Sequence, residues 1–195
     1  MDSTPLYETI SRHLDQAFLA RIASEYEKGR LLLIQTTDLD AGRPVLWNIG
    51  AIAASGDPRA LNLVRHILLA SASIPAASVM FDVEVNGRPY QEMHVDGGAV
   101  SQAFLVPPSL NTRQALKRSG FQRKSVVAYV IRNGRLTTEW SDVNRATLPI
   151  AEKAVSTLIN YNGVGDLYRM YLVTQRAGAT FNLAPTASAR SLFSN

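Results

Sequence analysis

The sequence predicts a layered α/β fold in which helices flank a mixed β-sheet. Segments with the helical spacing of apolar residues alternate with short runs typical of strands, and turn residues separate them. The length and composition agree with this prediction, because 195 residues with 46% hydrophobic content suit one globular core. We expect a single domain over residues 1–184, with ligands bound outside the ends of its strands.

The N-terminal part of the chain predicts two helices and then a pair of strands. Thr4-Pro5 combines a cap with a first-turn proline, and a second apolar stripe ends near Gly29. The apolar run 31–37 has the length of a buried strand, and 45–49 follows it after a turn. These elements open the α/β pattern.

The middle of the chain predicts a helix followed by a hairpin. Asp57-Pro58 is typical of a helix start, and apolar residues at helical spacing follow it. Alternating runs on either side of Asn86-Gly87 predict a two-residue hairpin turn. The hairpin strands are expected at 79–85 and 90–95.

The last part of the chain predicts helices at 112–119 and 150–159 and a β-branched strand at 126–131. Gly163-Val164-Gly165 resembles the start of a dinucleotide fingerprint, but no strand precedes it. We expect it to break the helical pattern instead. Residues 185–195 are rich in Ala, Ser and Thr and are expected to form a disordered tail.

Residue usage excludes several kinds of site. The chain has no cysteine, so disulfides, thiolate metal sites and cysteine nucleophiles are excluded. The three histidines are widely separated in sequence. We therefore expect neither a metal nor a cofactor.

The net charge of +4 is mildly basic, but the cations are spread along the chain, so no nucleic-acid partner is expected. One basic cluster lies at the end of an expected helix: Lys117, Arg118, Arg123 and Lys124. Solvation of a helix end is the simpler interpretation, and attraction to anionic lipid headgroups is the functional alternative. No apolar run reaches the length of a membrane span and no signal peptide is evident, so a cytoplasmic location is expected.

The stretch ending in Asp96-Gly97-Gly98 is the leading candidate for a functional site. It places an acidic residue at the end of an expected strand, followed by two glycines that let another segment or a substrate come close. A tight turn is the simpler interpretation of the same residues. His94 points to the same face of an extended strand as Asp96, and we expect it to pack or hydrogen-bond beside the site.

Several segments, taken in order, resemble the bacterial patatin-like phospholipase family. The resemblance covers most of the chain and fades after about Leu183. The segments that carry it are LLIQTTDLD at 32–40, RPVLWNIGAIA at 43–53, ASASIP at 70–75, HVDGG at 94–98 and AYVIRN at 128–133.

The resemblance implies a lipid acyl hydrolase with a Ser-Asp dyad and a glycine-rich oxyanion loop. Asp96 matches the dyad aspartate, the proton acceptor, and Gly97-Gly98 match the glycines that follow it. No Gly-x-Ser-x-Gly occurs in the chain, so no residue matches the nucleophile. We expect the N-terminal, nucleophile-bearing part of the family domain to be missing and the chain alone to be inactive on its lipid or ester substrate.

Other interpretations remain open. One is a non-catalytic module that associates with lipids or makes peripheral membrane contact. Another is an unrelated α/β protein in which Asp96 and nearby Asp82 or Glu84 hold a cation through oxygen ligands. A sheet edge left exposed by missing elements would favour self-association.

Overall fold

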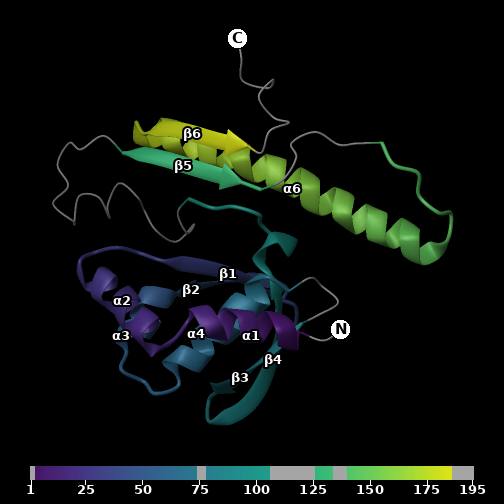
Figure 1. Cartoon of the computed structure of the whole chain (residues 1–195). Coiled ribbons are helices and arrows are strands. Elements are labelled where there is room, and N and C mark those ends of the chain that lie inside the picture. Colours follow the sequence, from purple (N-terminus) through teal and green to yellow (C-terminus); the bar gives the residue numbers. More distant parts are fainter. Residues whose placement is uncertain (1–2, 74–77, 106–125, 134–139, 186–195) are drawn as a thin grey trace. The chain divides into compact units, whose positions relative to one another are not determined.

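The computed structural model confirms the α/β fold and divides the chain into two compact units, Met1–Val100 and Ser101–Asn195 (Figure 1). The sequence predicted one domain over 1–184, whereas the division falls at Val100. Each unit is described by itself. The structure describes residues 3–73, 78–105, 126–133 and 140–185.

The first unit contains an antiparallel sheet with the strand order β2-β1-β4-β3. Its strands are β1 (Leu33–Asp38), β2 (Arg43–Asn48), β3 (Val79–Val85) and β4 (Arg88–Asp96). The predicted hairpin is confirmed, because Asn86 and Gly87 both have positive φ, as a tight turn between β3 and β4 requires. β1 pairs with β4, so two segments far apart in sequence lie side by side.

Four helices accompany this sheet: α1 (Thr4–His13), α2 (Gln16–Glu27), α3 (Ile49–Ala54) and α4 (Ala60–Ser71). α4 buries Val64, Ile67 and Ala70 at helical spacing, which places one face of the helix in the core. The Arg65 guanidinium donates to the carbonyl of Leu14 and so ties α4 to the end of α1. Buried apolar residues of these helices and of β3 form one continuous core cluster in this unit.

Helix α3 was not predicted, because its apolar residues follow directly from strand β2. The Asn48 side chain ends the strand and accepts a hydrogen bond from the N–H of Ala51 at 3.0 Å. This N-cap starts a helix where continuing apolar character indicated only a strand.

The second unit contains the parallel strand pair β5 (Val127–Arg132) and β6 (Thr180–Pro185) and the long helix α6 (Thr147–Ala177), which runs beside β6 in Figure 1. Val130 packs with Leu167 and Met170 in a small core. Parallel and antiparallel pairings thus occur in two separate sheets.

The predicted break at Gly163-Val164-Gly165 is wrong, because α6 continues through all three residues. Gly163 instead permits a close approach: a Cβ there would lie 2.0 Å from Oε1 of Gln102. The Gln102 side chain crosses the helix at this point and donates to the carbonyl of Ile159. Gly163 is therefore a packing position within a helix.

Some predictions concern residues at or beyond the limits of the described ranges. β6 reaches Pro185, so the first residue of the predicted tail belongs to a strand, while 186–195 lie outside the described residues. The helix expected at 112–119 and the basic cluster at 117–124 also lie outside them. Within the described ranges, no helix combines the length and apolar character needed to cross a bilayer.

Candidate functional site

Asp96 is the last residue of β4, and its exposed side chain lies where the strand passes into the short 3-10 helix η1 (Gly97–Ala99). Its Oδ1 accepts a hydrogen bond from the N–H of Gly98 at 2.9 Å. Within the described part of the chain, its Oδ2 makes no hydrogen bond or ion pair. The carboxylate therefore caps its own turn and keeps one oxygen available.

The backbone of Asp96 is held from two sides. Its N–H donates to the carbonyl of Ser73 at 2.9 Å, and its carbonyl accepts from the hydroxyl of Thr37 at 3.0 Å. The residue also pairs with Thr36 across the β1–β4 ladder. An exposed carboxylate thus projects from a fixed point of the sheet, which limits the directions it can take.

Gly97 is required by a close approach of two chain segments. A Cβ at this position would lie 2.7 Å from the carbonyl oxygen of Gln35, a distance that side chains do not tolerate. The Gln35 amide in turn donates to the carbonyl of Gly97 at 3.1 Å. At Gly98 the nearest atom to an added Cβ is Asp96 Oδ1 at 3.4 Å, so the second glycine is under less constraint.

His94, two residues before Asp96 in β4, is fully buried and belongs to a polar network. Its Nδ1 lies 2.9 Å from Thr36 Oγ1, which also accepts a hydrogen bond from Trp47 Nε1–H at 2.8 Å. Its Nε2 lies 3.2 Å from Glu92 Oε2. His94 makes no hydrogen bond to Asp96, so the two side chains have separate surroundings although they share a strand.

Asp38 is a member of the same cluster that the sequence did not single out. It ends β1, pairs with His94 across the ladder, and is 1% exposed. Ligating atoms of Asp38, Glu92 and His94 all lie within 4.8 Å of one another. The polar residues Thr36-Thr37-Asp38 at the end of an apolar strand could have indicated a site. No pattern of neighbouring residues, however, indicated that β1 pairs with β4.

The structure contradicts the cation hypothesis for Asp96 with Asp82 or Glu84. Asp82 lies opposite Gln91 and Glu84 opposite Pro89, toward the turn of the hairpin. Asp96 lies five positions along the strand from Gln91, which corresponds to roughly 17 Å. These carboxylates therefore do not share a site with Asp96.

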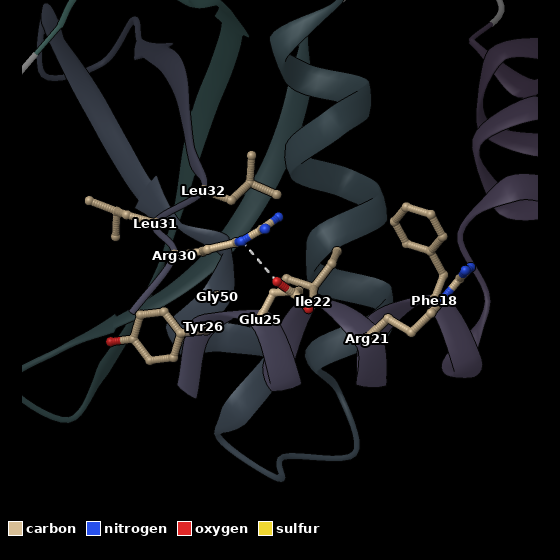
Figure 2. A pocket seen from close by; sticks show the side chains of 9 residues that line it. All are labelled: Phe18, Arg21, Ile22, Glu25, Tyr26, Arg30, Leu31, Leu32 and Gly50. Atoms are coloured by element: carbon tan, nitrogen blue, oxygen red, sulfur yellow. Dashed lines mark ion pairs between the residues drawn. The ribbon is translucent and has the colours of Figure 1, made fainter. Parts of the chain in front are cut away.

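A pocket of about 350 Å³ lies elsewhere in the first unit, between α2, the chain entering β1, and α3 (Figure 2). Most of its lining is apolar: Phe18, Ile22, Tyr26, Leu31, Leu32 and Gly50, with Arg21, Glu25 and Arg30. Arg30 Nε lies 2.9 Å from Glu25 Oε2, and the Arg21 guanidinium lies 4.9 Å from the centre of the Phe18 ring. A hydrogen bond from Lys28, together with the charge of Arg30, lowers the pKa of Glu25.

Asp96 does not line this pocket. Among the described residues of the first unit we distinguish three separate features: an exposed carboxylate at a strand end, a buried polar cluster two rungs along the same ladder, and an apolar pocket. The chain matches no protein-family model, and no curated protein is significantly similar to it.

Proposed function

We propose that this chain carries the aspartate half of a patatin-like lipid acyl hydrolase of the Ser-Asp type. The observation that carries the proposal is the placement of Asp96, whose backbone is held by Ser73 and Thr37 while its carboxylate faces solvent. A general base needs a fixed position and an oxygen that a hydroxyl group can reach. Asp96 meets both requirements.

In the proposed reaction, a serine hydroxyl attacks the ester carbonyl and its proton passes to Asp96. The bond between Oγ and the carbonyl carbon forms. When the tetrahedral intermediate collapses, the bond to the alcohol oxygen breaks and Asp96 returns the proton to the departing alcohol. A water molecule then hydrolyses the acyl-serine, with Asp96 again accepting the proton. The N–H of Gly98 binds Oδ1 and orients the carboxylate, so Oδ2 is the oxygen that accepts the proton. Donors for the oxyanion would come with the segment that carries the serine.

The chain contains no Gly-x-Ser-x-Gly, so we expect negligible ester hydrolysis when it is assayed alone. Members of a catalytic unit act together, and the loss of one typically costs orders of magnitude in rate. Hydrolysis of a short-chain nitrophenyl ester by the purified chain tests this expectation. A rate well above background that disappears in Asp96→Ala would contradict it.

A fusion tests the catalytic role directly. The nucleophile-bearing N-terminal segment of an active bacterial patatin-like phospholipase is joined to this chain, and hydrolysis of a phospholipid is measured. We expect activity that falls at least about 100-fold in Asp96→Asn. Asp82→Asn is the matched control, because Asp82 is an exposed aspartate on the same hairpin, and its fusion should keep its rate. A folded fusion without activity, or equal rates for both variants, contradicts the proposal.

The apolar pocket favours a second function, a non-catalytic module that associates with lipid surfaces. Leu31 is 56% exposed and Leu32 is 45% exposed beside two arginines, a combination suited to an acyl chain with an anionic headgroup. Flotation with anionic vesicles tests it. Leu31→Ser with Leu32→Ser should abolish flotation, whereas Leu39→Ser, at an exposed leucine outside the pocket, should not.

A further inference from the structure

We propose that Asp38, Glu92 and His94 form a binding site for one divalent transition-metal ion, with Zn²⁺ as the best fit. This inference goes beyond the hydrolase function and does not depend on it. Asp38 ends β1 and lies opposite His94 of β4, and Glu92 is two residues before His94 in the same strand. Their ligating atoms lie within 4.8 Å of one another, which is close enough to surround one ion after small side-chain rotations.

The buried carboxylate of Asp38 gives independent support. Its Oδ1 accepts a hydrogen bond from the N–H of Ala41 at 3.0 Å, but its Oδ2 is buried and has no hydrogen-bond partner. Arg43 Nε lies 3.7 Å from Oδ2, beyond hydrogen-bond distance, on a side chain that is 64% exposed. A buried carboxylate oxygen without a hydrogen bond is costly, and a bound cation would satisfy it.

The surroundings of His94 suit a metal ligand. A ligating imidazole usually donates its other N–H to a fixed acceptor, which sets the tautomer and the direction of the ring. Thr36 Oγ1 lies 2.9 Å from Nδ1 and can accept this hydrogen bond along with the one from Trp47, because a hydroxyl oxygen has two lone pairs. The Nε2 lone pair then faces Glu92, and the edge contact with the Phe81 ring fixes the imidazole further.

The donor set selects the kind of ion. One imidazole nitrogen with two carboxylate oxygens suits Zn²⁺ better than Mg²⁺, which prefers an all-oxygen octahedral shell. Tetrahedral zinc with bonds of about 2.0 Å places neighbouring ligand atoms about 3.3 Å apart. Glu92 Oε2 and His94 Nε2 already lie 3.2 Å apart. Glu92 is partly exposed, so the ion would enter the site from its side.

A bound ion would link β1 to β4 two rungs along the ladder from Asp96. The two strands share three register pairs, Thr36 with Asp96, Thr37 with Val95, and Asp38 with His94. A link at the last of these pairs would hold the short ladder in register.

Calorimetric titration of the chelator-treated, full chain with ZnCl₂ tests the site. We expect one Zn²⁺ per chain and at least about tenfold weaker binding in Glu92→Gln, a nearly isosteric change at a partly exposed side chain. Glu84→Gln, at an exposed glutamate on the neighbouring strand, should bind like the unmodified chain. Replacing both other histidines, His13→Gln with His66→Gln, should also leave binding intact, and MgCl₂ should give no such binding.

A second variant tests whether Asp38 and Arg43 form only a structural ion pair. Arg43→Gln removes the cation nearest Asp38 Oδ2 and should strengthen zinc binding a few-fold. Thermal melts recorded with each titration should show that zinc raises the Tm of the unmodified chain more than that of Glu92→Gln. Absence of stoichiometric zinc binding, or unchanged affinity in a folded Glu92→Gln variant, overturns the proposal.

Discussion

Asp38 and Asp96 end two neighbouring antiparallel strands, yet their carboxylates lie in opposite environments. Asp96 is exposed, and water can satisfy whichever oxygen the turn does not use. Asp38 is 1% exposed, and its Oδ2 has neither water access nor a hydrogen bond from the protein. The register places them two rungs apart on one ladder. Burial therefore leaves the Asp96 carboxylate open to solvent, whereas the charged neighbour of Asp38 Oδ2 is the Arg43 guanidinium, with Nε 3.7 Å away.

The largest stability effect is expected on the buried side of this comparison. His94→Ala deletes a ring that contacts Phe81 and Trp47, and it removes the hydrogen bond between that ring and the Thr36 hydroxyl. We expect a loss of about 3 kcal/mol in the free energy of unfolding, measured with urea. His13→Ala, at the exposed end of α1, is the control and should change it by less than about 0.5 kcal/mol. Equal effects of the two variants would contradict the assignment of His94 to the core.

The next effect concerns the close approach that positions Asp96. Gly97→Ala introduces a Cβ 2.7 Å from the carbonyl oxygen of Gln35, so one segment must shift. We expect a loss of about 2 kcal/mol, measured by the same denaturation. Gly98→Ala adds the same atom with more room and should cost less than about 0.5 kcal/mol. A tolerated Gly97→Ala would show that the turn adjusts freely and would weaken the case for a fixed Asp96.

A smaller effect is expected on the exposed side. Asp96→Ala removes the side-chain acceptor of the Gly98 N–H and should cost about 1 kcal/mol of stability, as for loss of an N-cap. Asp82→Ala lacks a capping role and should cost less than about 0.5 kcal/mol. A loss for Asp96→Ala as large as that for His94→Ala would mean that Asp96 is chiefly a structural residue.

The smallest expected effect on stability comes from the protonation of Asp57, an aspartate at the surface of the first unit. Hydrogen bonds from the Arg59 side chain and backbone N–H lower the pKa of Asp57 to about 2, from an ordinary value of 3.8. Because the pKa is depressed in the folded state, this stabilisation is complete above about pH 4 and is lost as the pH falls toward about 2. NMR titration of the Asp57 carboxyl group measures the midpoint, and Arg59→Ala should move it toward 3.8.

The local pattern around Asp96 was sufficient to predict the end of its strand. Asn86-Gly87 predicts the hairpin, and the two glycines after Asp96 indicate where its second strand ends, whereas the short 3-10 helix η1 was not predicted. The pairing of β4 with β1 depends on contacts between residues about sixty positions apart in sequence. No local periodicity encodes that pairing, so the cluster of Asp38 with His94 could not be predicted.

Glycine and asparagine account for two other differences from the sequence predictions. Gly163 suggested a helix break, but its role is to make room for the side chain of Gln102. Because Gln102 belongs to a segment distant in sequence, this role could not be predicted. The Asn48 side chain caps the start of helix α3, which was not predicted because the apolar residues around it indicated only a strand. In both cases a tertiary contact or a cap outweighed the local propensity.

The most direct measurement of the central claim is the activation of a serine by Asp96. A fluorophosphonate probe labels a serine only when a neighbouring base activates its hydroxyl. In the fusion with a nucleophile-bearing segment, we predict rapid labelling of the serine, loss of labelling in Asp96→Asn, and unchanged labelling in Asp82→Asn. Labelling that persists at the same rate in Asp96→Asn would contradict the assignment of Asp96 as the catalytic base.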